Sequence, residues 1–281
     1  MRALILDSSG YPELADLPEP DGDGVLRVLA CGLCGSDVEK IGGGAAGTVL
    51  GHEVAAELPD GRRVALVHHL PCGKCDRCLA GHESTCDEFR AATIEPGGFA
   101  ERVAARGGWI ELPTAVEAPV GTYVEPLACA LRGAERVPRG EVLVLGGGFM
   151  GTLFAAVLRH RGDTVYVRDV NPARNGPEPP GRVSSIVVSA PGAGRDALEA
   201  VEPGGTILVF ADPGPIDLGE VYRHEVTLLG SRSATPRHME EAVRLLPELD
   251  LPEPTIYPLA EFERGLDAYT SGKALKVVFT P

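Results

Sequence analysis

The sequence predicts an α/β protein with a β-rich, antiparallel, barrel-like part and a doubly wound parallel sheet. The first observation is that short alternating runs fill the first third of the chain and are separated by turn residues, as in RALILD, GVLRVLA, RRVALV and FAERVA. The second is a change of pattern from about Glu117, after which EVLVL, SSIVVSAP, GTILVF and VTLLGS form short apolar runs. Continuous apolar runs are typical of strands buried on both faces of a parallel sheet.

Helical segments separate these strands. APVGTYVEPLACALRGAERV, TLFAAVLRH and HMEEAVRLLPEL are expected to be helical, and the tail should contain a helix and a final strand. Residues 171–182, NPARNGPEPPGR, are too rich in proline and glycine to form a helix.

The charge balance narrows the set of partners. The chain carries 26 Lys and Arg residues against 40 Asp and Glu residues, which gives a formal net charge of −14. Nucleic acid and anionic membrane surfaces both require a basic surface, so we expect neither as a partner. The start, MRALILDSSGYPELADLPEP, lacks a charged segment followed by a long apolar run, and no stretch of about 18 apolar residues occurs. We therefore expect no secretory signal and no membrane span, and free cysteines then indicate the cytoplasm.

Four cysteines lie close together in PCGKCDRCLAGHESTC, residues 71–86. A disulfide framework is one interpretation, but 281 residues can bury a large core without crosslinks, and seven cysteines leave one unpaired. Short turns let neighbouring thiolates converge on one tetrahedral Zn²⁺. We predict a closed structural zinc site, which holds a loop and performs no chemistry, at Cys72, Cys75, Cys78 and Cys86.

A glycine-rich turn matching G-x-G-x-x-G stands between VLVL and TLFAAVLRH, a predicted strand and a predicted helix. A plain strand-turn-helix without a ligand would show the same pattern. In this context, however, the glycines let a pyrophosphate approach the backbone, where the helix N-terminus offers unpaired N–H groups. The residues predicted to contact a dinucleotide are Gly146, Gly148, Phe149, Met150 and Gly151.

Asp169 ends the next predicted strand, 23 positions after Gly146. Its carboxylate can accept hydrogen bonds from the ribose hydroxyls of adenosine and would repel a 2′-phosphate, so we predict NAD in preference to NADP. Arg168 and Arg174 flank this aspartate and could pair with a phosphate. We include Arg174 among the cofactor residues.

Two further fragments, Cys34-Gly35-Ser36-Asp37 and Gly51-His52-Glu53, carry metal-binding side chains. Each has an ordinary structural interpretation, because a lone cysteine near a strand is usually in the core and a lone His-Glu is usually at the surface. Together they supply the sulfur, nitrogen and oxygen ligands that zinc accepts, and three protein ligands leave a position open for water or substrate.

In this order, CGLCGSD, GHE, the four-cysteine loop, VEPLACAL and LGGGFMG resemble the zinc-containing medium-chain alcohol dehydrogenases. The resemblance covers nearly the whole chain and is strongest to the polyol (sorbitol or L-iditol) and L-threonine dehydrogenase branch. It implies a GroES-like catalytic domain over residues 1–118 and 251–281. A Rossmann cofactor domain over 119–250 would be inserted between these two parts.

The resemblance also implies roles for single residues. Glu125 of VEPLACAL would ligate a catalytic zinc ion or hold its water, Asp37 would orient a zinc histidine, and Ser36 would pass on the proton of the alcohol. Cys31 and Cys129 match no ligand position and are expected in the core. The implied ligands of this second, catalytic zinc ion are Cys34, His52 and Glu53.

The chain departs from the family at the proton relay. Most relatives have a histidine five residues after the zinc cysteine, where this chain has Glu39. His69 matches a histidine of threonine dehydrogenases near the substrate and could substitute, and His68 falls where relatives line the pocket. Both could also be ordinary histidines at the end of a strand. The candidate catalytic residues are Ser36, Glu39, His69 and Glu125.

A larger departure follows Asp169. Relatives continue with a helix, a strand and another helix, whereas here about a dozen residues precede SSIVVSAP. The third Rossmann strand and its flanking helices should therefore be absent, which leaves a truncated sheet of about five strands. That would remove one wall of the adenine pocket.

Two functions remain open. The first is a zinc- and NAD-dependent dehydrogenase that oxidises a secondary alcohol, a polyol or sugar alcohol, to the ketone, in a homodimer or homotetramer. The alternative is a noncatalytic zinc-binding relative with a degraded cofactor domain that serves as a scaffold or binds a partner. The candidate metal ligands, the glycine motif and Asp169 together favour the enzyme.

Overall fold

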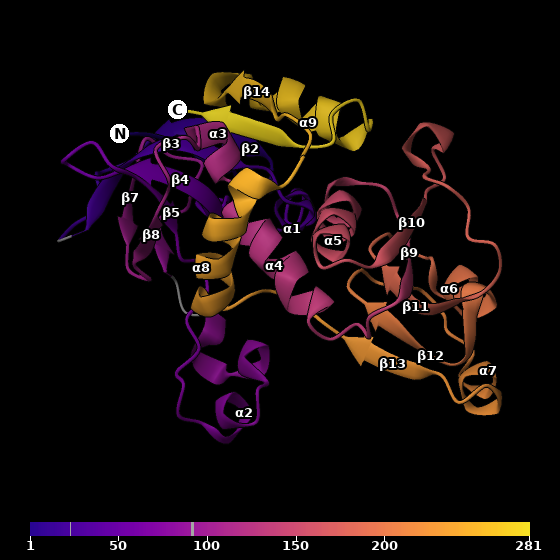
Figure 1. Cartoon of the computed structure of the whole chain (residues 1–281). Helices are drawn as coiled ribbons and strands as arrows, with labels where there is room; N and C mark the ends of the chain where they lie inside the picture. Colours follow the sequence, from indigo (N-terminus) through magenta and orange to yellow (C-terminus); the bar gives the residue numbers. More distant parts are fainter. Residues whose placement is uncertain (23, 91–92) are drawn as a thin grey trace. The chain divides into compact units, whose positions relative to one another are not determined.

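The structure is a computed structural model of the chain, and it describes residues 1–22, 24–90 and 93–281. The chain divides into two compact units (Figure 1). Unit 1 comprises Met1–Glu125, Thr235–Pro247 and Pro252–Pro281, and unit 2 comprises Pro126–Ala234 and Glu248–Leu251. Across the described ranges, no helix has both the length and the apolar character needed to cross a bilayer.

The framework of unit 1 is an eight-stranded sheet in the order β14-β15-β3-β4-β5-β8, in which β7 pairs with both β3 and β6. Apart from the parallel pair β14 and β15, its pairs are antiparallel. A separate hairpin is formed by β1 (Arg2–Leu6) and β2 (Pro12–Asp16). The sheet strands are β3 (Val25–Gly32), β4 (Glu53–Glu57), β5 (Arg63–Leu66), β6 (Ile94–Glu95), β7 (Arg102–Ala105), β8 (Trp109–Glu111), β14 (Thr255–Pro258) and β15 (Val277–Thr280).

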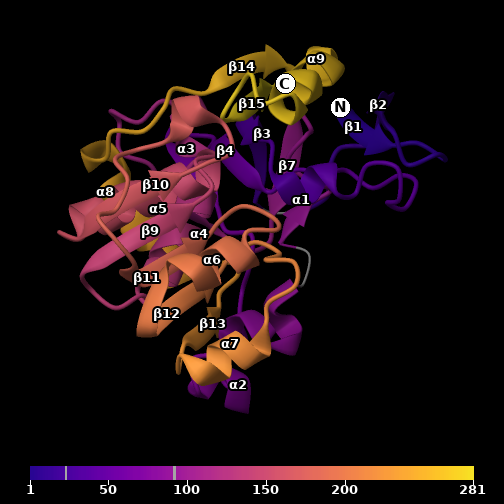
Figure 2. The ribbon, with the colours of Figure 1, turned by 90° about the vertical axis from the view of Figure 1, so that its right-hand side faces the viewer.

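The last strand of the chain completes this sheet. β15 pairs antiparallel with β3, with Phe279 opposite Cys31, so segments from both ends of the sequence lie side by side (Figure 2). The aromatic ring of Phe279 meets those of Phe99 and Phe262 at centroid distances of 5.5 and 4.8 Å. These buried rings fix the C-terminal segment against the first part of the chain, because burying each aromatic side chain removes a large apolar surface from water.

Short helices complete unit 1. The segment that contains α2 (Asp76–Leu79) extends away from the sheet (Figure 1). The boundary between the units falls inside α4 (Val124–Ala134). The remaining helices assigned mainly to unit 1 are α1 (Gly35–Val38), α3 (Ala118–Gly121), α8 (Pro236–Leu245) and α9 (Phe262–Thr270), with 3₁₀ turns η1 (Glu83–Thr85), η2 (Asp87–Arg90), η4 (Leu246–Glu248) and η5 (Leu259–Glu261).

Unit 2 contains a parallel sheet of five strands in the order β10-β9-β11-β12-β13. The central residues of the inner strands β9 and β11 are almost wholly buried, which explains their continuous apolar runs, whereas those of the edge strand β13 are half-buried. The strands are β9 (Glu141–Leu145), β10 (Thr164–Arg168), β11 (Val183–Val188), β12 (Val201–Val209) and β13 (Thr227–Gly230).

Helices cover both faces of this sheet. α5 (Phe149–His160) connects β9 to β10, α6 (Gly194–Ala200) connects β11 to β12, and α7 (Leu218–Arg223) precedes β13. The first two connections run in opposite directions along the strand order, so right-handed crossovers place α5 and α6 on opposite faces (Figure 1). The predicted fold class is confirmed: a β-rich antiparallel part with a doubly wound parallel sheet.

The predicted truncation of the parallel sheet is confirmed as well. Among the described residues of unit 2, β11 is the next strand after β10, and the connection contains only the 3₁₀ turn η3 (Pro172–Arg174). β10 is therefore an edge strand. The high proline and glycine content of residues 171–182 explains why no longer helix forms there.

Candidate active site

Three metal-binding side chains converge in unit 1. One ligand atom from each of Cys34, His52 and Glu53 lies within 4.8 Å of the other two. Strand pairing explains this, because Cys34 follows the end of β3, Glu53 begins β4, and Gly32 is paired with Glu53. A Cβ atom on Gly32 would lie 2.1 Å from Glu53 Oε2, so only glycine leaves room for the carboxylate there. The donor set fits zinc and leaves a coordination position open.

Asp37 lies behind the histidine, as the resemblance predicted. Its Oδ1 is 3.4 Å from His52 Nδ1, and it also accepts hydrogen bonds from the backbone N–H groups of Gly51 and Cys34. Burial would lower the pKa of His52, but the Asp37 carboxylate raises it well above its ordinary value. Because Asp37 engages Nδ1, His52 can offer Nε2 to an ion.

Glu53 has a partner that the sequence analysis missed. Lys276 forms an ion pair with it, both side chains are 2% exposed, and Lys276 Nζ also donates to the Leu33 carbonyl oxygen at 3.0 Å. A carboxylate has about four lone-pair sites, so Glu53 can accept from Lys276 and still coordinate an ion. The sequence feature that could have indicated a buried, paired lysine is Lys276 itself, which stands within the otherwise apolar run ALKVVF.

Two hydroxyl groups lie near Cys34 or its neighbour Gly35. Ser36 Oγ donates to Cys34 Sγ at 3.4 Å, and Glu39 is an exposed residue that caps the C-terminus of α1. Tyr269 of α9 was not predicted, and its hydroxyl is 3.5 Å from the position that a Cβ on Gly35 would take. Burial and the negative charge of Cys34 raise the pKa of Tyr269 above its ordinary value.

His68 and His69 form a row of rings that starts at His52. The centroids of His52 and His68 are 4.6 Å apart, those of His68 and His69 are 3.9 Å apart, and His69 stacks on Phe89 at 4.5 Å. Burial, with the charges of His52 and His69, lowers the pKa of His68 to about 2, so this ring is neutral at pH 7. His69 is therefore one ring farther from the metal ligands than His68.

Glu125 is buried near the start of α4. Among the described residues, the ligand atoms that gather around Cys34 do not include its carboxylate. Direct ligation by Glu125 would therefore require its side chain to move.

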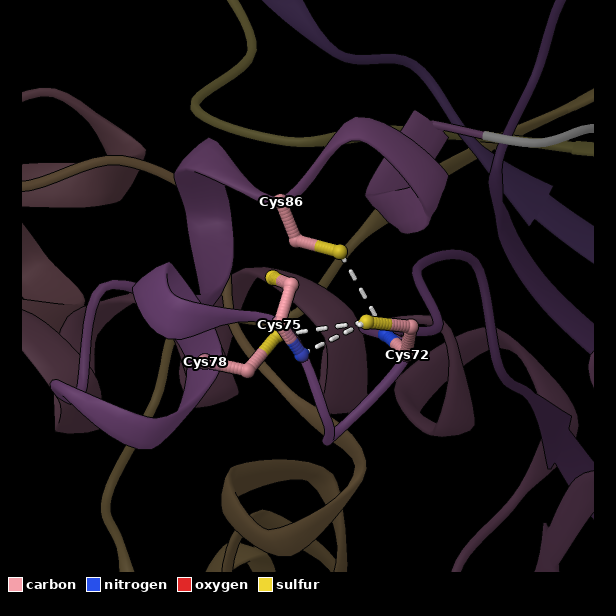
Figure 3. Close-up of side chains that lie close together, drawn as sticks. All are labelled: Cys72, Cys75, Cys78 and Cys86. Atoms are coloured by element: carbon pink, nitrogen blue, oxygen red, sulfur yellow. Dashed lines mark hydrogen bonds between the residues drawn. The ribbon is translucent and has the colours of Figure 1, made fainter.

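The four predicted cysteines of the loop also converge, with one sulfur each within 4.8 Å of the others (Figure 3). Backbone N–H groups of Cys72 and Cys75 donate to the sulfurs of Cys86 and Cys72, both at 3.4 Å. N–H donation from Lys74 and Cys75 lowers the pKa of Cys72, which favours the thiolate that a metal requires. All seven cysteines are free of disulfides, and the two expected in the core, Cys31 and Cys129, are buried.

The glycine-rich turn of unit 2 lies between β9 and α5, with Gly148 as the N-cap residue and Phe149 and Met150 in the first turn of the helix. Asp169 directly follows β10, and its Oδ2 accepts a hydrogen bond from Gly147 N at 2.6 Å. Arg174 ends η3 and packs close to Gly147. The structure thus brings Asp169 and Arg174 to the same turn as the glycines.

Comparisons with known proteins agree with this arrangement. Residues 20–114 match the family "Alcohol dehydrogenase GroES-like domain". D-altritol 5-dehydrogenase of Agrobacterium fabrum (strain C58) is 30% identical over 296 residues, which cover 88% of each chain. Sorbitol dehydrogenase of Halalkalibacterium halodurans is 27% identical over 341 residues, covering 100% of this chain and 99% of the relative. That alignment is longer than the chain itself, so the relative has segments that this chain lacks.

Solved structures show the same fold. Acetophenone reductase from Geotrichum candidum NBRC 4597, solved in complex with NAD, superposes with a TM-score of 0.85 at 19% identity, covering 100% of this chain and 97% of the reductase. At this identity the match concerns the fold alone.

Proposed function

The chain belongs to the zinc-dependent medium-chain alcohol dehydrogenase family, in its polyol and L-threonine dehydrogenase branch, and we propose that it oxidises a secondary alcohol of the polyol or sugar-alcohol class to the ketone. The observation that carries this proposal is the convergence of Cys34, His52 and Glu53 with Asp37 behind the histidine. Residues 1–118 and 251–281 would form the catalytic domain and residues 119–250 the cofactor domain, whereas the compact units divide at 125/126 and assign Thr235–Pro247 to unit 1. A homodimer or homotetramer is part of the proposal.

The residues around the site would have different roles in the reaction. Bound zinc would lower the pKa of the alcohol hydroxyl, and a nicotinamide would accept the hydride. Asp37 fixes the orientation of the His52 ring, and Lys276 holds the Glu53 carboxylate in its buried position. Ser36 can accept and pass on a proton beside Cys34.

A substrate panel tests the function. With added zinc and NAD, at least one sugar alcohol is expected to produce NADH absorbance, because the relatives include D-altritol and sorbitol dehydrogenases. L-threonine belongs in the panel, since L-threonine 3-dehydrogenase of Streptomyces coelicolor is 35% identical over 62% of this chain. A folded protein with two zinc ions, no NAD binding and no turnover would instead support the noncatalytic alternative.

The cofactor preference is tested at Asp169. Asp169→Ala should weaken NAD binding by about 1–3 kcal/mol, because a charge-assisted hydrogen bond to the ribose is lost. The difference in affinity between NAD and NADP should therefore become smaller. Dissociation constants for both cofactors measure this. Faster reduction of NADP than of NAD by the wild-type protein would show that pairing of Arg168 or Arg174 with the 2′-phosphate decides the cofactor preference instead.

The proton relay is tested at His69. Free histidine side chains titrate near about pH 6.5 and free glutamate side chains near about pH 4.3, so a histidine is the better proton carrier at pH 7. His69→Ala should lower turnover by roughly 10- to 1000-fold and remove an inflection at about pH 6–7, with zinc content unchanged. His224→Ala, at an exposed helix end in unit 2, is the matched control. Normal turnover in His69→Ala beside impaired turnover in Glu39→Ala would assign the relay to Glu39.

A further inference from the structure

The truncated sheet leaves β10 as an edge strand, and the segment that follows folds back on it. Gly176 N donates to the Val167 carbonyl oxygen at 2.9 Å, and Glu178 pairs with Arg168 at 2.7 Å. These contacts cover part of the outer edge of β10 with residues 171–178, which we call the replacement turn. The replacement turn occupies the place in the sequence from which a strand and two helices are missing.

Within the replacement turn, three local hydrogen bonds hold the backbone from Asn171 to Asn175. Asn171 Oδ1 accepts from Ala173 N at 3.1 Å, which caps η3, and Arg174 N donates to the Asn171 carbonyl oxygen at 2.9 Å. Asn175 N donates to the Pro172 carbonyl oxygen at 3.2 Å. A segment this rich in proline and glycine therefore adopts one defined conformation through its two asparagine residues.

The same network holds Asp169 from three directions. Gly147 N donates to Asp169 Oδ2 at 2.6 Å, and Asn171 N donates to Oδ1 at 2.7 Å. The backbone N–H of Asp169 donates to Asn175 Oδ1 at 2.6 Å. Both carboxylate oxygens keep a free lone-pair site, so Asp169 presents two fixed acceptors, which is the pattern that two neighbouring ribose hydroxyls require.

The replacement turn also touches the glycine-rich turn directly. A Cβ atom on Gly147 would lie 2.9 Å from both the Cβ and the carbonyl oxygen of Arg174. Only glycine at position 147 therefore lets η3 approach the turn this closely. The glycine-rich turn, Asp169 and the replacement turn form one packed corner within unit 2.

We propose that the replacement turn is a substitute wall for the adenosine half of a dinucleotide, and that Asn175 is a positioning residue that holds Asp169 toward the ribose. This inference rests on the proposed function for the identity of the ligand. It reverses the expectation that losing the third strand opens this side of the site.

Binding of the two halves of the cofactor tests the proposal without requiring turnover. Calorimetry measures the binding of AMP, NAD and nicotinamide mononucleotide. Asn175→Ala should lower the affinities for AMP and NAD by the same factor, about 5- to 20-fold, because one backbone hydrogen bond that fixes Asp169 is lost. Nicotinamide mononucleotide affinity and zinc content should not change. Asn175→Asp keeps an acceptor for the Asp169 N–H and should recover part of the AMP affinity. Glu199→Gln, which removes a surface ion pair on α6, is the control.

The outcomes separate this inference from the proposed function. Unchanged AMP affinity in Asn175→Ala, or an equal loss for nicotinamide mononucleotide, overturns the inference even when the wild-type enzyme turns over. Turnover with NAD in a wild-type protein that shows no AMP binding overturns it too. AMP binding that depends on Asn175, in a protein without dehydrogenase activity, supports the proposed role of the replacement turn and rejects the proposed function.

Discussion

Replacing Cys34 with serine is expected to lower turnover by at least about 1000-fold and to leave one zinc ion per chain. Among the described residues the thiolate is one of three converging ligands, and the ion it helps to hold would contribute several kcal/mol to transition-state stabilisation, at about 1.4 kcal/mol for each tenfold in rate. Metal analysis and steady-state kinetics on the same preparation measure both effects. A chelator should remove the ion at Cys34 before the ion at the four cysteines, because the site at Cys34 keeps an open coordination position.

Cys86→Ser is the matched thiol variant. It should lose the other zinc ion and lower the melting temperature, while the ion at Cys34 and measurable turnover remain, because the four-cysteine segment extends from the sheet of unit 1 (Figure 1). A single zinc ion in fully active wild-type protein, or complete loss of turnover with retention of both ions in Cys34→Ser, would contradict the assignment.

The second large effect is expected at Lys276. Lys276→Met should lower the free energy of unfolding by about 3–5 kcal/mol in chelated protein, because it leaves the Glu53 carboxylate buried without its counter-charge. With zinc bound, the loss should be smaller, since the ion supplies positive charge to the same carboxylate. Denaturant unfolding with and without zinc measures the difference.

Lys273→Met provides the comparison three residues away. Lys273 is 73% exposed and pairs with the exposed Asp267, so its loss should cost no more than about 1 kcal/mol in either condition. An identical loss for Lys276→Met with and without zinc would show that Glu53 does not interact with the ion.

Local spacing was enough to predict the four-cysteine cluster, whereas the set of Cys34, His52 and Glu53 was implied by the family resemblance. Cys72, Cys75 and Cys78 are separated by only two residues each and so lie near one another, and the structure brings their sulfurs and that of Cys86 into one cluster. The missing strand was also visible, because too few residues separate Asp169 from the next apolar run to form a helix, a strand and another helix.

Contacts between segments that are distant in the sequence could not be predicted from local spacing. Lys276 reaches Glu53 because β15 pairs with β3, and β3 in turn pairs with β4. Tyr269 approaches Gly35 because α9 packs beside this C-terminal strand. These contacts depend on which strands pair and on how helices pack between segments far apart in the sequence, so no single local pattern predicts them.

The sequence by itself therefore determined the type of each candidate site: which side chains could bind a metal, where a glycine-rich turn joins a strand to a helix, and that the parallel sheet is short. Only the tertiary structure decided how these groups are held, with Glu53 against Lys276, His68 between His52 and His69, and Glu125 outside the ligand cluster. It also decided that residues 171–178 fold back on Asp169. Ligand identity depends on the chemistry of single residues close in sequence, whereas their orientation depends on burial and hydrogen bonds that form only when remote segments pack together.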